Sequence, residues 1–194
     1  MQIIVARYNE DMDWTKQFPN VLIYNKGTKF NNEYNEIQLN NVGREGHTYF
    51  KHIYDNYENL EDYIIFLQGN PFDHSPDLIQ NINKYMNKYN NNSLDLEFEY
   101  LSKKIIDCNL IGCRWFIELP LRDIYEKIFN ERKEYMDFRF GVGAQFIVSK
   151  NTILKRPKSF YLNIIEILEK DVDPIEGHAI ERFHSIIFGN PLYI

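Results

Sequence analysis

Short apolar runs separated by polar segments dominate the chain and predict buried strands. Four such runs lie at residues 2–6, 21–24, 63–67 and 146–148. Because they do not alternate apolar with polar side chains, they are typical of strands covered on both faces, the usual state in a parallel sheet. The alternating segment 94–100 predicts a further strand, although a helix competes from Tyr100 on.

Between these runs, apolar residues recur every three or four positions, which predicts amphipathic helices. Ser75 as N-cap and Pro76 in the first turn are expected to start one of them, and residues 28–41 are expected to form a solvated loop. The predicted helices cover residues 49–57, 76–89, 120–129, 157–170 and 175–188, with a short one capped by Asp11 or Asp13. The pattern predicts an α/β fold, a mostly parallel central sheet flanked by helices, in one domain over residues 1–194.

Composition and charge narrow the function classes. The 194 residues are 44% hydrophobic and 15% aromatic, as expected of a packed domain in which Trp115 and most tyrosines lie in the core or a cleft wall. A net charge of −6 argues against nucleic acid as a partner. No run approaches a membrane span and no secretion signal is visible, so we expect a soluble, cytoplasmic protein. Cys108 and Cys113 are then expected to be buried free thiols.

The segment 62–74 is the strongest candidate for a functional site. Its apolar run ends abruptly at Gln68, Gly69 and Asn70, and Asp73 and His74 follow. Ligands in open α/β sheets bind outside the carboxyl ends of the strands, so polar residues at such a tip predict a site. An ordinary turn, with Asp73 capping the next helix, is an equally good interpretation.

Two other predicted strands also end in polar residues. The first is followed by Arg7, Tyr8, Asn9 and Glu10, and the second by Asn25 and Lys26. We expect both tips to lie beside the 62–74 segment, because carboxyl ends of parallel strands share one edge of a sheet.

Glycines mark two further candidate segments. Gly43, Arg44 and Glu45 precede a predicted helix, where free backbone amides and a guanidinium can meet an anion; a tight loop is the alternative. Gly143 and Ala144 leave room for a ligand or another backbone, and Gln145 beside them is expected to shape a substrate pocket; a close strand crossing is the alternative.

The opening stretch, residues 3–11, resembles the first strand and nucleotide-contacting loop of glycosyltransferases with the GT-A fold. Four segments more specifically resemble an uncharacterised family of domains of unknown function that is itself glycosyltransferase-like. They are Ala6-Arg-Tyr-Asn-Glu-Asp11, Asn41-Val-Gly-Arg-Glu-Gly-His-Thr-Tyr49, Phe66-Leu-Gln-Gly-Asn-Pro-Phe-Asp-His74 and Gly143-Ala-Gln-Phe-Ile-Val-Ser149. The resemblance implies a GT-A-like, nucleotide-diphospho-sugar transferase type of fold, with a nucleotide-sugar donor and a glycan or small carbohydrate acceptor.

The resemblance also implies a divalent metal, Mn²⁺ or Mg²⁺, held by an Asp-x-Asp motif at the tip of a central strand. Gln68, Gly69 and Asn70 stand at the matching positions, so both acids are missing. Asn70, Asp73, His74 and His184 are the remaining candidate ligands. Alternatively no metal is used, and Arg7, Lys26 or Arg44 neutralises the phosphates.

The family fold further implies an acid late in the chain that acts as a base toward the acceptor hydroxyl. Glu181, followed by Arg182, matches this arrangement, and an exposed helix carboxylate is an equally good interpretation. Asp73 is the second candidate base. His47 and His52 are expected to have packing or hydrogen-bonding roles.

The resulting hypothesis is a glycosyltransferase, assisted by a divalent metal. Two alternatives stay open: a metal-dependent hydrolase built on Asp73, His74, Glu181 and His184, and a non-catalytic nucleotide- or glycan-binding module.

Overall fold

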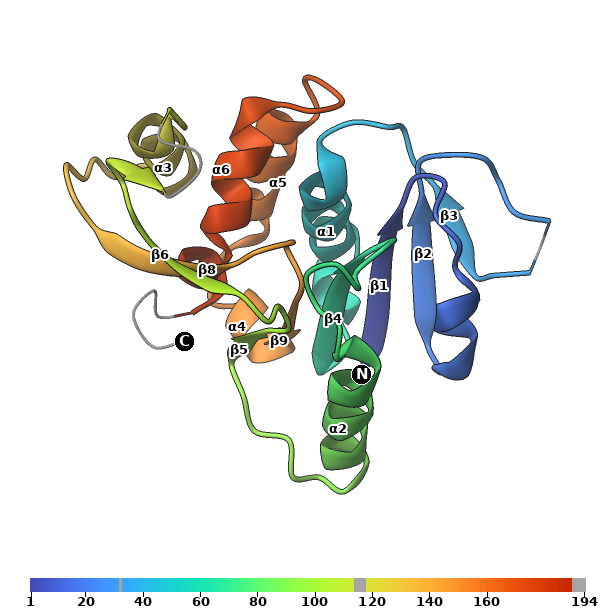
Figure 1. The fold of residues 1–194 in the computed structure, drawn as a ribbon. Coiled ribbons are helices and arrows are strands. Elements are labelled where there is room, and N and C mark those ends of the chain that lie inside the picture. Colours follow the sequence, from blue (N-terminus) through green and yellow to red (C-terminus); the bar gives the residue numbers. More distant parts are fainter. Residues whose placement is uncertain (32, 114–117, 190–194) are drawn as a thin grey trace.

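A six-stranded sheet forms the centre of the computed structural model, which describes residues 1–31, 33–113 and 118–189 (Figure 1). Its strand order is β3-β2-β1-β4-β9-β5. The strands are β1 (Gln2–Arg7), β2 (Val21–Asn25), β3 (Glu36–Gln38), β4 (Tyr63–Gln68), β9 (Phe146–Ser149) and β5 (Phe98–Tyr100). Trp115, which we expected in the core or a cleft wall, lies outside the described residues.

The central sheet is mixed, so the prediction of a mostly parallel sheet is wrong. Strands β1 to β4 run parallel, whereas β9 pairs antiparallel with β4 on one side and with β5 on the other. An apolar run shows that a strand is buried on both faces but does not encode its direction, and this is why the sequence pattern missed the reversal.

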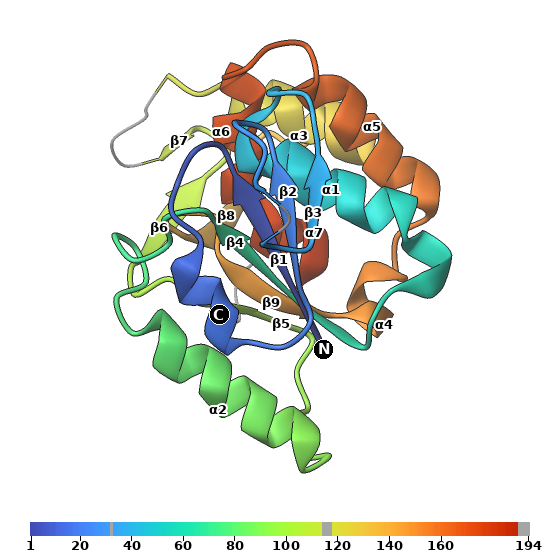
Figure 2. The same cartoon turned by 90° about the vertical axis from the view of Figure 1, so that its right-hand side faces the viewer.

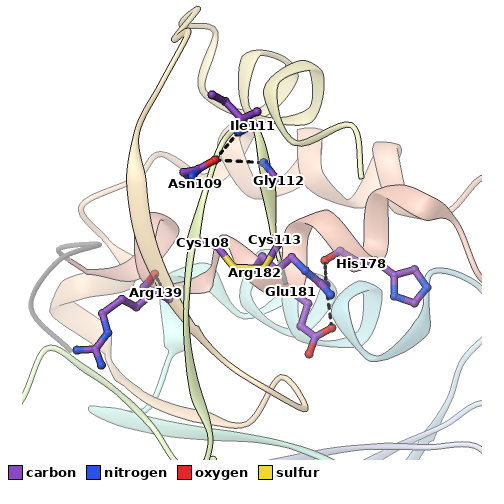
Figure 3. The surroundings of a disulfide bond; sticks show 10 residues. Cys108, Asn109, Ile111, Gly112, Cys113, Arg139, His178, Glu181 and Arg182 are labelled. Carbon is purple, nitrogen blue, oxygen red and sulfur yellow. Dashed lines mark hydrogen bonds and ion pairs between the residues drawn. A yellow bond between two sulfur atoms is a disulfide. The ribbon is translucent and has the colours of Figure 1, made fainter. Parts of the chain in front are cut away.

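A second, antiparallel sheet of three strands has the order β7-β6-β8. Its strands are β6 (Ile105–Asn109), β7 (Gly112–Cys113) and β8 (Asp137–Gly141). The chain passes from β5 directly into β6, so the helix that competed with a strand from Tyr100 on does not form there. The Asn109 Oδ1 atom accepts the Ile111 and Gly112 amides and so shapes the β6–β7 turn (Figure 3).

The prediction of free thiols is wrong, because a disulfide joins Cys108 to Cys113 across this turn (Figure 3). The two residues are direct partners in the β6–β7 register, with Cα atoms 4.7 Å apart. Disulfides are rare in reducing compartments, so cysteine usage no longer supports the cytoplasmic prediction. Within the described residues, none of the helices has the length and apolar character needed to cross a bilayer.

Helices cover both faces of the central sheet (Figure 2). One face packs on α2, with Ile3, Val5, Ile65 and Leu67 pointing toward it. The alternate side chains of the same strands point to the other face, which α1, α5, α6 and α7 cover. The helices are η1 (Asp13–Gln17), α1 (Arg44–Asp55), η2 (Tyr57–Asn59), α2 (Leu78–Asn90), α3 (Leu121–Phe129), α4 (Lys150–Ile153), α5 (Lys158–Leu168), α6 (Ile175–Arg182) and α7 (His184–Phe188).

Several predicted boundaries differ from the observed ones. The loop 28–41 contains β3, the strand predicted over 94–100 is limited to β5, and the helix predicted over 175–188 is divided at Phe183 into α6 and α7. Asp77 precedes α2, while the Ser75 Oγ atom donates to the Leu101 carbonyl instead of capping the helix. At Ser75 a tertiary contact thus outweighs the local preference for capping.

Candidate functional site

A cavity of about 660 Å³ opens at the carboxyl edge of the parallel strands. The chain runs from β1 outward to β2 and β3 and then returns to place β4 on the other side of β1, which makes a topological switch point at this edge. Ten of the predicted site residues line the cavity: Arg7, Tyr8, Glu10, Lys26, Arg44, Glu45, Gln68, Gly69, Asn70 and Asp73. Segments distant in sequence therefore form one polar cleft.

A second cavity, of about 240 Å³, adjoins the first, and Arg44 and Gln68 line both. Four more of the predicted site residues line it, namely His74, Gly143, Glu181 and Arg182. Gly143 sits with φ +94° against the His74 ring, where a Cβ atom would lie only 2.5 Å from the His74 Cδ2 atom. The larger cavity is thus extended toward α6.

Six predicted site residues line neither cavity: Asn9, Asn25, Gly43, Ala144, Gln145 and His184. Three of them, Asn9, Asn25 and Gln145, make hydrogen bonds that support the cleft wall. The fully buried Asn25 accepts from Arg7 and from the Gly27 amide, and the Gln145 Nε2 atom donates to the Pro71 carbonyl beneath the β4 tip. The Asn9 Oδ1 atom accepts the Thr28 amide and ties two loops together.

Arg7 orders the loop that follows β1. Its Nε atom donates to the Glu10 carbonyl, and its Nη1 atom donates to the Tyr8 and Thr28 carbonyls and to Asn25. The guanidinium also lies 4.0 Å from the centre of the Phe30 ring. These contacts fix the cleft wall and hold Tyr8, whose side chain is 52% exposed, at its rim.

Lys26 holds the turn that begins α1. Its ammonium group donates to the Val42 and Arg44 carbonyls, and burial lowers its pKa to about 8. The Gly43 and Arg44 amides donate on the other side to the Asp171 and Val172 carbonyls. Both residues have positive φ, +61° and +51°.

Arg44 extends from this turn to the boundary between the two cavities. Its Nη1 atom contacts the Asp173 Oδ1 atom at 3.0 Å and the His178 Nε2 atom at 2.9 Å, and its Nε atom lies 3.7 Å from a Glu45 oxygen. Burial and the positive charge of Arg44 lower the pKa of His178, so a neutral ring accepts this contact.

Glu181 is a largely buried carboxyl group at the end of the second cavity, with 12% of its side chain exposed. Its Oε1 atom accepts the Gly143 amide at 2.9 Å, and its Oε2 atom lies 3.6 Å from the Arg182 Nη1 atom (Figure 3). Burial raises its pKa, and the nearby charge of Glu45 adds to the effect. A carboxyl group with a raised pKa in a cleft is well suited to proton transfer near neutral pH.

The predicted metal ligands do not come together. Asn70 and Asp73 line the larger cavity and His74 the smaller one. His184 lies in the aromatic core, with its ring centre 4.7 Å from that of Phe146, and burial lowers its pKa to about 3. Across residues 1–31, 33–113 and 118–189, no group of three His, Cys, Asp or Glu side chains is arranged to hold a metal ion.

Sequence reasoning missed two residues of the site. Asp173 lines the larger cavity and His178 the smaller one, and both contact Arg44, from which they are separated by 129 and 134 residues. No local pattern marks either one, since their importance comes from the packing of the loop before α6 against the start of α1.

The sequence that contains the site segments matches a known protein family. A profile for the family described as "Protein of unknown function (DUF3431)" matches residues 3–193. The chain belongs to this family. No curated protein and no solved structure matches it. The DUF3431 match covers every residue of the two cavities, so the whole site lies within the family domain.

Proposed function

We propose that this DUF3431 protein is a glycosyltransferase that moves a sugar from a nucleotide-sugar donor to a hydroxyl group of a carbohydrate or glycan acceptor. The observation that carries the proposal is the pair of adjoining cavities with the buried Glu181 carboxyl group in the smaller one. A transferase needs places for two substrates, and the larger cavity has a volume typical of small-molecule sites.

The fold supports the same assignment. The order β3-β2-β1-β4 of the parallel strands matches that of the first four strands of a doubly wound, nucleotide-binding sheet, and the larger cavity lies at its switch point. We therefore assign the chain to the GT-A-like, nucleotide-diphospho-sugar transferase type of fold. The donor occupies the larger cavity, where Tyr8 offers an exposed aromatic face to its base or sugar.

The transfer needs a base that removes the proton of the acceptor hydroxyl and a leaving group, the diphosphate, that carries away the negative charge. The acceptor oxygen forms a bond to the anomeric carbon, and its proton passes to the Glu181 carboxylate. The bond between the anomeric carbon and the diphosphate oxygen breaks, and its electron pair leaves with the diphosphate. The Gly143 amide and Arg182 hold the Glu181 carboxyl group for this role.

The proposal is tested by the Glu181→Gln variant. Purified protein is incubated with UDP-, GDP-, ADP- and CDP-sugars and a mixture of glycan acceptors, and nucleoside diphosphate release and the glycosylated product are measured by mass spectrometry. We expect the turnover of Glu181→Gln to fall by roughly 10²–10⁴-fold while donor binding is retained, because only the proton acceptor is lost. The matched control is Glu166→Gln, an exposed glutamate on α5, which should react like the wild type.

Two outcomes would argue for other functions. Donor cleavage that proceeds equally well without any acceptor indicates a hydrolase, and donor binding without turnover indicates a binding module. The hydrolase is the weaker alternative, because its four expected residues do not share one site. Asp73 lines the larger cavity, His74 and Glu181 line the smaller one, and His184 lies in the aromatic core.

A further inference from the structure

The cleft offers a guanidinium where the family resemblance leads one to expect a metal site. Gln68, Gly69 and Asn70 stand at the tip of β4 in place of a carboxylate pair. The carboxylates that line the larger cavity, Glu10 among them, do not gather into a group of three ligands in the described part of the chain. The neutral amides at the strand tip therefore supply none of the anionic ligands that a carboxylate pair would give to a divalent cation.

We propose that Arg44 is the group that neutralises the leaving diphosphate, and that Asp173 takes the place of the phosphate on Arg44 in the ligand-free protein. This inference rests on the proposed sugar transfer, since it names the cation of that reaction. Arg44 borders both cavities, which is where the bond between sugar and diphosphate would break.

The backbone of Arg44 is fixed before any ligand arrives. Its amide donates to the Val172 carbonyl, its own carbonyl accepts from Lys26, and its φ of +51° is unusual for a residue with a side chain. Such conformations cost free energy and occur at functional sites, where the surrounding contacts enforce them. A guanidinium held in place stabilises a developing charge without reorganising during the reaction.

The side chain is held as firmly as the backbone. A Cβ atom added to Gly177 on α6 would lie 3.3 Å from the Arg44 Cδ atom, so this glycine leaves space for the arginine stem. The neutral His178 ring accepts from the Nη1 atom at 2.9 Å, and Asp173 lies on the same atom at 3.0 Å. The loop before α6 and α6 itself thus direct the Arg44 guanidinium toward the junction of the two cavities.

Asp173 is a partner that a diphosphate can displace. Its side chain is 65% exposed, and ion pairs with exposed carboxylates are weak because water screens them. A diphosphate carries more charge, and its oxygens match the planar fork of a guanidinium.

The other charged groups in the larger cavity leave this role to Arg44. Glu10, Glu45 and Asp73 repel a diphosphate. Arg7 and Lys26 already donate to backbone carbonyls, those of Arg7 in the loops after β1 and β2 and those of Lys26 in the turn that begins α1. Removing Asp173 lowers the repulsion and also removes the competitor, so its loss should strengthen diphosphate binding.

The test is isothermal titration of UDP, GDP, ADP and CDP into wild type and variants in buffer with EDTA. We expect at least one of these diphosphates to bind without metal. Arg44→Gln should raise its Kd by about 10–100-fold. The Kd of Arg44→Lys should lie between those of the wild type and Arg44→Gln, because lysine keeps the positive charge but lacks the paired donors of the guanidinium. Asp173→Asn should lower the Kd by about two- to fivefold.

Substitutions at the two residues of this ion pair are expected to change the Kd in opposite directions, which a general loosening of the site would not produce. Circular dichroism melts confirm that each variant is folded, and Arg132→Gln, at an arginine whose side chain is 75% exposed, is the matched control with an unchanged Kd. If diphosphate binding requires Mn²⁺ or Mg²⁺, or if Arg44→Gln binds the diphosphate like the wild type, the proposed role of Arg44 is wrong but the proposed sugar transfer still stands. If none of the four diphosphates binds with or without metal, the proposed sugar transfer fails as well.

Discussion

Gly143 closes the second cavity, and replacing it with alanine tests the geometry of the site. Its φ of +94° lies in a region that side chains disfavour, and an added Cβ atom would approach the His74 Cδ2 atom to 2.5 Å and its Cβ atom to 2.7 Å. The Gly143 amide also donates to Glu181. The Gly143→Ala variant should therefore lose both stability and the alignment of the carboxyl group.

The expected loss has two parts. Placing alanine at positive φ costs about 1–2 kcal/mol, and crowding the His74 side chain costs about 1–3 kcal/mol more. A total of about 2–5 kcal/mol corresponds to a fall in Tm of roughly 4–20 °C for a chain of this length. In the His74→Gly background, which removes the Cβ atom as well as the ring, only the backbone part should remain, so the two substitutions should be coupled by about 1–3 kcal/mol.

Thermal melts and urea titrations of the single and double variants measure these values. Gly46→Ala is the matched control, because Gly46 lies within α1 and an added Cβ atom would meet the Leu168 Cδ1 atom at an ordinary 3.4 Å. Alanine is favoured in a helix, so this variant should gain about 0.5–1 kcal/mol. A Gly143→Ala variant as stable as wild type would refute the reasoning, and an equal loss with and without His74 would refute the assigned contact.

Two further predictions concern acid and reducing conditions. Burial lowers the folded-state pKa of His184 to about 3, so the unfolded chain binds the extra proton below about pH 6.5, and stability falls on acidification. Wild type should therefore lose about 2 kcal/mol more than His184→Phe between pH 7 and pH 5 in urea titrations, and parallel pH profiles would contradict this. The Cys108–Cys113 link closes a short loop, so Cys108→Ser should cost roughly 2 kcal/mol when melts are run without reductant. With reductant the wild type should melt like the variant, and an unchanged wild-type melt would show that the disulfide contributes no stability.

The strands of the cleft and the polar residues at their tips could be predicted from the amino-acid sequence. Uninterrupted apolar runs predicted β1, β2, β4 and β9, because a strand buried on both faces carries apolar side chains on both sides. Parallel strands present their carboxyl ends at one edge, so the residues after β1, β2 and β4 were bound to meet there. The helix after Gly43 followed from its three- and four-residue period.

Three features could be read only from the folded chain: the direction of β9, the pairing of the two cysteines and the location of His184 in the aromatic core. The folded chain also decides which residues meet Arg44. Asp173 and His178 follow it by more than a hundred residues, and no nearby pattern points to either. Hydrophobic periodicity indicates which side of a helix or strand is buried, but not which distant residues it contacts. The partner of a charged side chain, and the burial that shifts its pKa, depend on packing between segments that the sequence keeps far apart.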